Sequence, residues 1–511
     1  MFYELLKFLF PNLAMGTYFR IFGYTSVRVP CALACAFITS LLIGPAIIRR
    51  LIRLKAGQPI KQFKTAEFNI HQHKHGTPTM GGIIILFSTT LAVLLFCDPG
   101  NSYVWMTLLM MLGAGALGFA DDYKKVALKD NKGVSAKTKL IVQTLLGLLL
   151  GVFLYLGHSH TAYGPLLLEN ADILNRPAFV AEMQKGKTPL GDTLRAQLPL
   201  NLVQRLDAFD GSPEAANQVL PVLLKELNTV IQGKALYDPQ LYQGIALTDE
   251  ARERLESYRL EQQMEPGKER PESGRLEPPA IPSTRLNRYL LESAYPTLVA
   301  HNKVVRGDAY LLVPFFKNVY PYMGVLFIFW VAFVLVSSSN AVNLTDGLDG
   351  LAISTVITVS LPYLMIAYLV SRFDFASYLY VPHIPQAGEL SVFMAAMLGS
   401  ALGFLWFNSH PAEVFMGDTG SLALGAAIGA VAVLTKHEIL LILIGGIFVI
   451  EAFSVVLQIA SYRLRGKRIL LMSPLHNHFV KKGVNEAKII SRFFIFATIL
   501  AMAGLSTLKL R

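Results

Sequence analysis

Acidic side chains stand close to glycines at three places in this chain, each at the end of an apolar run. They are Asp121 with Asp122, Asp346 with Asp349, and Asp418. Carboxylates suit Mg²⁺, a hard cation that takes one or two of them and completes its shell with water and phosphate oxygens. Glycine lets the backbone approach a ligand closely. The pattern favours magnesium-assisted chemistry on a phosphorylated substrate, although each turn alone is also typical of an ordinary loop.

Asp121 and Asp122 follow the apolar run 103–120 and precede a lysine-rich stretch that includes Lys125 and Lys139. Adjacent residues of a helix point about 100° apart. We therefore expect one acid to face a shared cavity and the other to support it. The alternative for this pair is a solvated helix end with neighbouring lysines.

Further polar residues lie in other breaks between apolar runs. Lys74 and Thr79 precede two glycines at 81–82, where the backbone amides of a helix start can bind an anion. His476 and His478 are one residue apart. Since no cysteine or third imidazole lies near them in sequence, contact with phosphate or substrate is favoured over zinc.

The composition indicates an integral membrane protein. Of 511 residues, 53% are hydrophobic and 16% are charged, which is too much apolar surface for one soluble core. The net charge of +11 is explained by topology and anionic headgroups, and we expect no binding to nucleic acid. Cys31, Cys35 and Cys97 have no metal-site spacing and imply no disulfide framework. A removable signal peptide is not expected.

Ten apolar stretches approach the length of a membrane-spanning helix. They cover residues 27–48, 79–96, 103–120, 140–156, 322–338, 351–370, 390–407, 421–434, 439–459 and 489–506. Lysine and arginine concentrate after the first, third and ninth stretches, which by parity share one side of the membrane. By the positive-inside rule this side is cytoplasmic and both termini are extracytoplasmic. The acidic positions also lie in odd-numbered linkers. The stretch 340–350, for example, is the fifth linker along the chain and is therefore expected on the cytoplasmic side. The sequence thus predicts an all-α polytopic membrane protein of ten transmembrane helices.

The linker after the fourth stretch is much longer than the others. Residues 157–310 are close to neutral and separate a first membrane part, 1–156, from a second, 311–511. Leucines in 217–231 have helical spacing, whereas 261–283 is rich in Glu, Pro and Arg, which is typical of a linker. We expect a soluble, extracytoplasmic insert that is partly helical and partly disordered and has no catalytic role.

Five segments together carry a resemblance to a known family. They are Gly76-Thr-Pro-Thr-Met-Gly-Gly82, Phe119-Ala-Asp-Asp-Tyr123, Asn340 to Ala352, Phe415-Met-Gly-Asp418 and Ser473-Pro-Leu-His-Asn-His-Phe479. In this order they resemble the phospho-N-acetylmuramoyl-pentapeptide-transferases of the polyprenyl-phosphate N-acetylhexosamine-1-phosphate transferase superfamily. The resemblance covers about residues 20–156 and 311–511 and leaves out the insert.

The resemblance implies a multi-pass protein of the bacterial cytoplasmic (inner) membrane, with its site on the cytoplasmic face. It implies Mg²⁺-dependent transfer of phospho-N-acetylmuramoyl-pentapeptide from UDP-N-acetylmuramoyl-pentapeptide to undecaprenyl phosphate. The products would be lipid I, for peptidoglycan synthesis, and UMP. The lipid bilayer is then a partner, and a homodimer is an assembly that the sequence leaves open.

Matching positions imply roles for individual residues. Asp418 corresponds to the Mg²⁺ ligand and Asp121 to a base or a positioner of the lipid phosphate, with Asp122 beside it. The residues implied to line the nucleotide and diphosphate cavity are Lys74, Thr79, Asn343 and Asp346. Those implied to form the uridine pocket are Gly347, Leu348, Asp349, Asn408 and Phe415. Further implied contacts to phosphate or substrate are Lys125, Lys139, His476 and His478.

One position departs from the family pattern, which usually has three consecutive histidines where this chain has His476-Asn477-His478. Asparagine cannot be protonated, so no proton relay is expected at Asn477. Two alternatives remain: a sister transferase for another UDP-amino sugar, and a lipid-linked transporter. A transporter would need ionisable residues near mid-span and weak inverted repeats; we expect neither, because the acids lie at span ends on one side.

Overall fold

The computed structural model is helical wherever it describes regular elements. It describes residues 20–54; 77–156 except 127, 129, 131 and 132; 180, 181, 184 and 198–232; and 309–509 except 310, 317–320, 373, 374, 377, 378, 380, 383 and 385. The chain forms two compact units. One consists of Met1–His160 with Asp308–Arg511, and the other of Thr161–Gly307.

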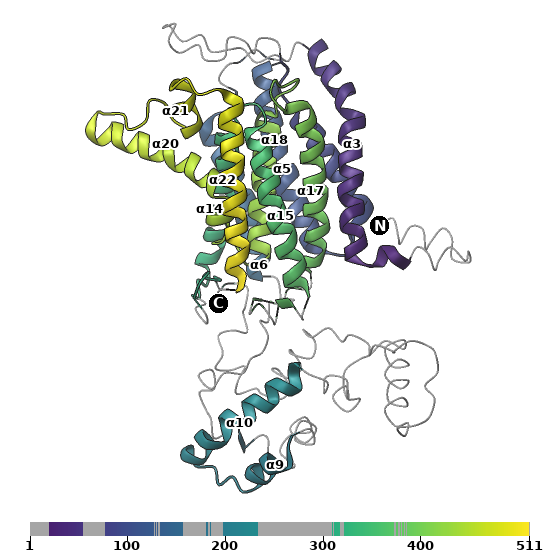
Figure 1. Ribbon diagram of the computed structural model, residues 1–511, viewed down its shortest axis with the longest axis vertical. Coiled ribbons are helices and arrows are strands. Elements are labelled where there is room, and N and C mark those ends of the chain that lie inside the picture. Colours follow the sequence, from purple (N-terminus) through teal and green to yellow (C-terminus); the bar gives the residue numbers. More distant parts are fainter. Residues whose placement is uncertain are drawn as a thin grey trace. The chain divides into compact units, whose positions relative to one another are not determined.

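The first unit is a bundle of long helices (Figure 1). Before the insert they are α3 (Thr25–Arg53), α4 (Gly82–Phe96), α5 (Ser102–Val126) and α6 (Ala136–Leu156). After it come α14 (Leu326–Thr345), α15 (Leu351–Ser371), α17 (Ala387–Asn408), α18 (Gly417–Leu434), α19 (Leu441–Ile444), α20 (Gly446–Arg465), α21 (Leu475–Lys481) and α22 (Glu486–Ser506). Two 3-10 turns, η1 (Arg20–Gly23) and η8 (Thr507–Lys509), flank the bundle in sequence.

Nine helices in the described part of the chain are long and apolar enough to cross a membrane, and α4, with 15 residues, is a shorter apolar helix. The chain is therefore a multi-pass membrane protein, as its composition predicts. The apolar windows of α17 and α18 are 83% and 89% buried, whereas those of α3, α6, α20 and α22 are only 28% buried. Apolar helices that remain this exposed require lipid rather than water around them.

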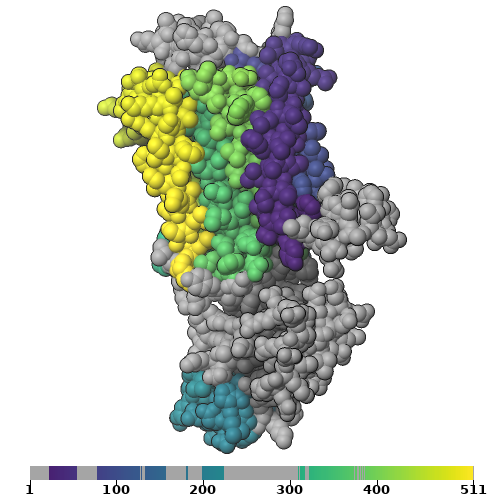
Figure 2. All heavy atoms as spheres, turned by 45° about the vertical axis from the view of Figure 1, so that its right-hand side comes forward, coloured from purple at the N-terminus to yellow at the C-terminus, as the bar shows by residue number. Residues whose placement is uncertain are grey.

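The packing order explains how distant motifs meet. On one face α22, α15, α17 and α3 lie side by side (Figure 2). Behind them α18 packs against both α5 and α14. α5 carries the adjacent acids and α14 carries the two asparagines of the 340–350 stretch. The buried helix α18 thus brings its own acid, Asp418, between them.

Glycines allow these helices to approach backbone to backbone. A Cβ at Gly118 of α5 would overlap the carbonyl oxygen of Asp418, and a Cβ at Gly82 of α4 would overlap the backbone of Gly420 in α18. A side chain at either position would separate the helices, because a backbone atom cannot move aside as a flexible side chain can. The position of Asp418 therefore depends on the small residues of α4 and α5.

Two spans differ from the sequence prediction. The stretch 340–350 is predicted as a break, but α14 continues to Thr345, so that Asn340 and Asn343 lie in its last turns and only 346–350 is non-helical. The amide of Asn340 donates to Gln143 Oε1 at 2.8 Å, and Asn343 is likewise satisfied by α18. Partner helices thus supply the hydrogen bonds that a lipid-facing helix would lack.

The ninth predicted stretch, 439–459, is divided at Gly445. α19 ends there, and α20 runs outward from the bundle (Figure 1). Apolar side chains of α20 such as Phe453 and Val456 are exposed. α20 is thus covered by protein mainly near its start, where it packs on α14, α21 and α22.

The second unit contains α9 (Leu200–Asp207) and α10 (Pro213–Gln232), which pack against each other. Their buried side chains include Leu202, Leu206, Leu220 and Leu223. The helical spacing of leucines in 217–231 is confirmed by α10. The segment 261–283, expected to be a linker, lies outside the described residues, and the domain boundaries remain predictions.

Candidate active site

Two acids and two lysines meet where α5 ends and α6 and α18 begin. Lys139 Nζ lies 2.9 Å from Asp121 Oδ2 and also contacts Asp418. Lys125 contacts Asp121, one turn away, and its Nζ lies 3.6 Å from Asp418 Oδ2. Val134 donates its N–H to Asp121 Oδ1 at 2.7 Å. Asp121 is fully buried and Asp418 is partly exposed. The group formed by these two acids and two lysines, here called the acidic cluster, is therefore open to a ligand at Asp418.

Asp122 lies beside these residues but does not contact the lysines through an ion pair among the described residues; it caps α18 instead. Its Oδ2 accepts hydrogen bonds from the Thr419 N–H at 2.9 Å and the Thr419 hydroxyl at 2.7 Å. Its Oδ1 accepts from the Asp418 N–H at 3.3 Å. A carboxylate at a helix N-terminus satisfies free N–H groups and the helix dipole. The expectation that the two adjacent acids face different ways is confirmed.

Asn343 orients the carboxylate of Asp418 from the other side. Its Nδ2 lies 3.0 Å from Asp418 Oδ1 and 2.8 Å from Ser421 Oγ. The Ser421 hydroxyl donates to the carbonyl of Gly417 at 2.9 Å. α14 and α18 thereby hold Asp418 in one orientation.

The non-helical residues 346–350, here called the 346–350 loop, join α14 to α15. Burial, reinforced by the Asp418 and Asp122 carboxylates, raises the pKa of Asp346 to about 8. Gly350 has a positive φ of 75° and donates its N–H to Asn408 Oδ1 at 3.0 Å. Asn408 is buried, and its side chain therefore shapes the loop.

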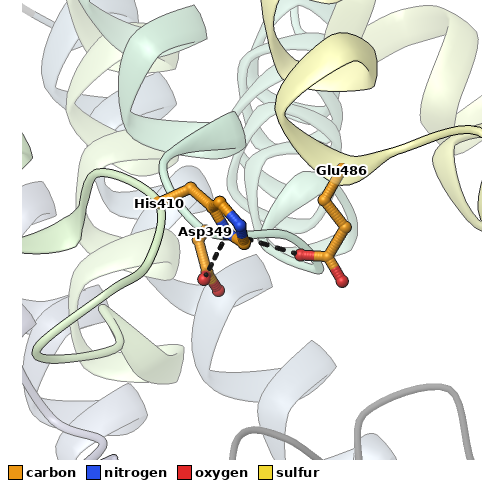
Figure 3. Close-up of side chains that lie close together, drawn as sticks. All are labelled: Asp349, His410 and Glu486. Atoms are coloured by element: carbon orange, nitrogen blue, oxygen red, sulfur yellow. Dashed lines mark hydrogen bonds and ion pairs between the residues drawn. The ribbon is translucent and has the colours of Figure 1, made fainter.

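Asp349 lies in a second polar group, shown in Figure 3. Its Oδ2 is 3.1 Å from His410 Nδ1 and 3.2 Å from the Ala412 nitrogen. Glu486, the first residue of α22, places Oε2 3.8 Å from the same His410 nitrogen. The imidazole thus lies between two carboxylates from different elements, and sequence reasoning identified only Asp349.

The segment before α4 pairs with the segment before α18. Phe415 donates its N–H to the carbonyl of Pro78 at 2.8 Å, and the Gly81 N–H donates to the Phe415 carbonyl at 2.8 Å. The Gly82 N–H donates to Met416 at 2.9 Å. The predicted anion site at 81–82 is therefore wrong, because the chain itself uses these amides. Thr79 is buried beside Gly417, at the edge of the acidic cluster.

The two histidines of α21 point to different places. His476 is 1% exposed and is bound to Glu451 of α20, which is fully buried. His478 accepts a hydrogen bond from the Leu471 N–H at 3.1 Å and lies edge-on to Phe479. Burial and the nearby Lys482 lower the pKa of His478. The structure does not bring both rings to one ligand.

The predicted residues thus divide into two neighbouring groups, two further positions and one residue that the structure does not describe. The acidic cluster holds Asp121, Lys125, Lys139 and Asp418, with Asp122, Asn343, Thr79 and Asp346 beside it. The 346–350 loop and its supports hold Gly347, Leu348, Asp349, Asn408 and His476. Phe415 lies in the strand-like pairing with Pro78, His478 lies apart, and Lys74 lies outside the described residues.

Sequence reasoning missed Ser421, His410, Glu486 and Glu451. The statement that all acids lie at span ends is wrong for Glu451, which lies inside α20. A single acid in an apolar run was the signal that could have found it, because such a residue is rarely tolerated without a partner. For His410 and Glu486 the sequence offers no comparable signal.

Comparison with known proteins decides the family. Residues 286–436 match the Glycosyl transferase family 4 profile, and residues 74–86 match Phospho-N-acetylmuramoyl-pentapeptide-transferase signature 1. Phospho-N-acetylmuramoyl-pentapeptide-transferases of Citrifermentans bemidjiense and of a Geobacter species are each 35% identical over 503 residues, covering 98% of this chain and 99% of the relative. The chain belongs to the phospho-N-acetylmuramoyl-pentapeptide-transferase family.

The acids of this transferase fit a divalent cation. Asp121, Asp122 and Asp418 each offer an oxygen, and these atoms lie within 4.8 Å of one another. Because Asp122 already caps α18, Asp121 and Asp418 are the available ligands. Two carboxylates match the number that Mg²⁺ takes beside phosphate and water, although carboxylates alone do not specify the metal.

Proposed function

We propose that this protein transfers phospho-N-acetylmuramoyl-pentapeptide from UDP-N-acetylmuramoyl-pentapeptide to undecaprenyl phosphate, giving lipid I and UMP. The observation that carries the proposal is the cluster of Asp121, Asp418, Lys125 and Lys139 at one end of the bundle. It supplies carboxylates for a metal and ammonium groups for phosphates within one site. Family membership identifies the substrates with which this chemistry is to be tested.

Asp418 would be the main ligand of Mg²⁺, with the buried Asp121 beside it. When bound, this ion neutralises charge on the diphosphate. Asn343 fixes the orientation of Asp418, and Asp122 fixes the start of α18. Lys125 and Lys139 are then available for phosphate oxygens, because their present carboxylate partners would turn to the metal.

The reaction forms one P–O bond and breaks another. An oxygen of the lipid phosphate attacks the β-phosphorus of the UDP precursor, and UMP leaves with the bridging oxygen. A phosphate monoester has a second pKa of about 6 and is mostly dianionic at neutral pH. Asp121 therefore serves to position charge rather than to remove a proton, and positioning with charge neutralisation supplies most of the rate.

The 346–350 loop would recognise the nucleotide. Asp349 would accept a hydrogen bond from the uracil, beside Gly347 and Leu348, and Asn408 would hold the loop in shape. Phe415 would contribute an aromatic surface. Lys74, Thr79, Asp346 and His478 complete the proposed substrate-binding set, and the buried His476 would support the loop from behind.

The membrane arrangement is part of the proposal. α4 would complete ten crossings, both termini and the insert would be extracytoplasmic, and the site would open to the cytoplasm of a bacterial inner membrane. The basic residues of the linkers after the first, third and ninth stretches support this orientation. Accessibility of single introduced cysteines at the two membrane faces would test it.

The activity is tested with purified protein in detergent, undecaprenyl phosphate and UDP-N-acetylmuramoyl-pentapeptide, with UMP release measured with and without Mg²⁺. We expect UMP only when both substrates and the metal are present. UDP-N-acetylglucosamine in place of the pentapeptide precursor tests the sister-transferase alternative. Absence of UMP with every metal tried would overturn the proposal.

A further inference from the structure

Glu451 is a carboxylate buried in the second turn of α20. Its Oε1 accepts the backbone N–H of His476 at 3.1 Å, and its Oε2 lies 3.1 Å from Nδ1 of the same residue. A buried carboxylate is costly unless it is paired in this way. Glu451 thus joins α20 to α21 by two hydrogen bonds to His476.

These contacts determine where the imidazole carries its proton. An ionised carboxylate only accepts hydrogen bonds, so Nδ1 of His476 must be the donor. Nε2 has no hydrogen-bond partner among the described residues. It faces Gly347, where an added Cβ would overlap it. A bare lone pair against a Cα–H is tolerable, whereas an N–H there would be a buried, unsatisfied donor.

The 346–350 loop therefore rests on the α20–α22 side of the bundle at two adjacent residues. Gly347 lies against the ring of His476, and its own N–H donates to the carbonyl of Thr345 at 2.8 Å. Leu348 is buried in an apolar cluster with Ile447 of α20 and with residues of α22. The next residue is Asp349.

We propose that Glu451 and His476 form a positioning pair that holds the 346–350 loop in its nucleotide-binding conformation. His476 acts through Gly347 rather than by touching the nucleotide, since its ring is 1% exposed. Glu451 acts through His476 by keeping the proton on Nδ1. This inference rests on the proposed function, because it assigns the loop to nucleotide binding.

The isosteric change Glu451→Gln tests the pair. The new amide can still accept the backbone N–H of His476, but its NH₂ group then faces Nδ1 and forces the ring proton to Nε2, against Gly347. We expect KM for the UDP precursor to rise roughly tenfold or more, as for loss of a charged hydrogen bond. The kcat value and the KM for undecaprenyl phosphate should change little.

Two further variants separate positioning from general damage. Glu451→Asp keeps the carboxylate and should recover part of the lost nucleotide affinity. Ser454→Ala removes a hydroxyl one turn along α20 that, among the described residues, bonds only to the Glu451 carbonyl of its own helix, and should leave KM unchanged. If Glu451→Gln lowers kcat at unchanged KM, or if Ser454→Ala raises KM as much, the positioning role is wrong.

Ring protonation provides a readout independent of turnover. Solid-state ¹⁵N spectra of histidine-labelled protein in bilayers, with the His476 signal assigned by its loss in His476→Gln, should show the Nδ1–H tautomer. Glu451→Gln should convert it to Nε2–H. A wild-type ring protonated on Nε2 alone would overturn the inference. Failure of wild-type protein to release UMP would instead contradict the proposed function and leave the tautomer measurement decisive for the pair.

Discussion

At the scale of single residues, Asp121 and Asp122 illustrate how adjacent identical side chains acquire different environments. Their directions differ by about 100° on the helix, so Asp121 meets two lysines while Asp122 meets the start of α18. The same sequence motif therefore provides both a charged site and a helix cap.

Asn340 and Asn343 differ in the same way. Asn340 bonds to Gln143 and to the Val336 carbonyl, within the packed interior of the bundle. Asn343, nearly one turn later, reaches Asp418 and Ser421. Because α14 extends through part of the predicted loop, Asn340 has a structural role and Asn343 belongs to the site.

We predict that Asp418→Asn abolishes Mg²⁺-dependent turnover, by at least about 100-fold, because a neutral amide cannot balance a divalent charge. Asp121→Asn should retain measurable turnover that rises as the pH passes through about 6 and then levels off, because the lipid phosphate ionises without a protein base. Both are measured as kcat against pH and Mg²⁺ concentration. An equal, pH-independent loss in the two variants would contradict the assignment.

At the scale of elements, the site depends on how closely α18 approaches α4 and α5. Gly82 and Gly118 allow backbone contact, and Asp122 secures the first turn of α18 from within α5. The crossing therefore sets the distance between Asp121 and Asp418. A change of packing at the crossing should reach the chemistry without altering any charged residue.

We predict that Gly118→Ala lowers both turnover and the melting temperature, because its Cβ meets the immovable carbonyl of Asp418. Overpacking of this kind costs about 1–3 kcal/mol, which corresponds to a fall of several degrees. Gly113→Ala in the same helix is the control, since its Cβ would meet the flexible side chain of Leu146. Equal effects of the two variants would show that the crossing has no special role.

At the scale of the whole molecule, the acidic cluster and the 346–350 loop both belong to the unit formed by Met1–His160 and Asp308–Arg511. Every contact described above for these groups is made within that unit. The unit Thr161–Gly307 has its own buried leucines on α9 and α10. We therefore expect the insert to be dispensable for the reaction.

We predict that replacing residues 161–307 by a short Gly/Ser linker leaves UMP release within about tenfold of the intact protein, a change of about 1.4 kcal/mol in the barrier. UMP release and the melting temperature of the two proteins are compared in the same detergent. A well-folded deletion variant without activity would mean that the insert takes part in the reaction.

Glu438, between α18 and α19, makes the stability of the molecule depend on pH. Burial raises its pKa from the ordinary 4.5 to about 7, against the opposing effect of Lys436. The folded protein therefore holds a proton that the unfolded chain releases between these values. The contribution of Glu438 to the free energy of unfolding is highest below a pH of about 4.5, falls as the pH rises to about 7, and is absent above it.

We predict that the melting temperature of the wild-type protein in detergent declines over this pH range relative to that of Glu438→Gln, by on the order of a few degrees. The variant cannot ionise at this position, so the difference between the two curves isolates Glu438 from other titrating groups. Parallel curves for the two proteins would show that Glu438 does not change its protonation on unfolding.

The sequence by itself determined the class of protein, the positions of the apolar segments and the set of motifs that belong to one site. These properties depend on local composition, segment length and parity, all of which can be read without knowing which helices touch. The charged character of the cluster was likewise visible, because its acids and lysines lie beside span ends. The location of Asp418 between α5 and α14 could not be read in this way.

Only the tertiary structure decided which partner each polar residue has. In the folded chain Asp122 caps α18, and the backbone amides of residues 81–82 bond to carbonyls of the same chain. His476 and His478 have separate partners. The tertiary structure also paired Glu451 with His476, two residues that no sequence motif connects. The physical reason is that helix packing, governed by glycines and side-chain shapes distant in sequence, determines which polar groups are buried together and must satisfy one another.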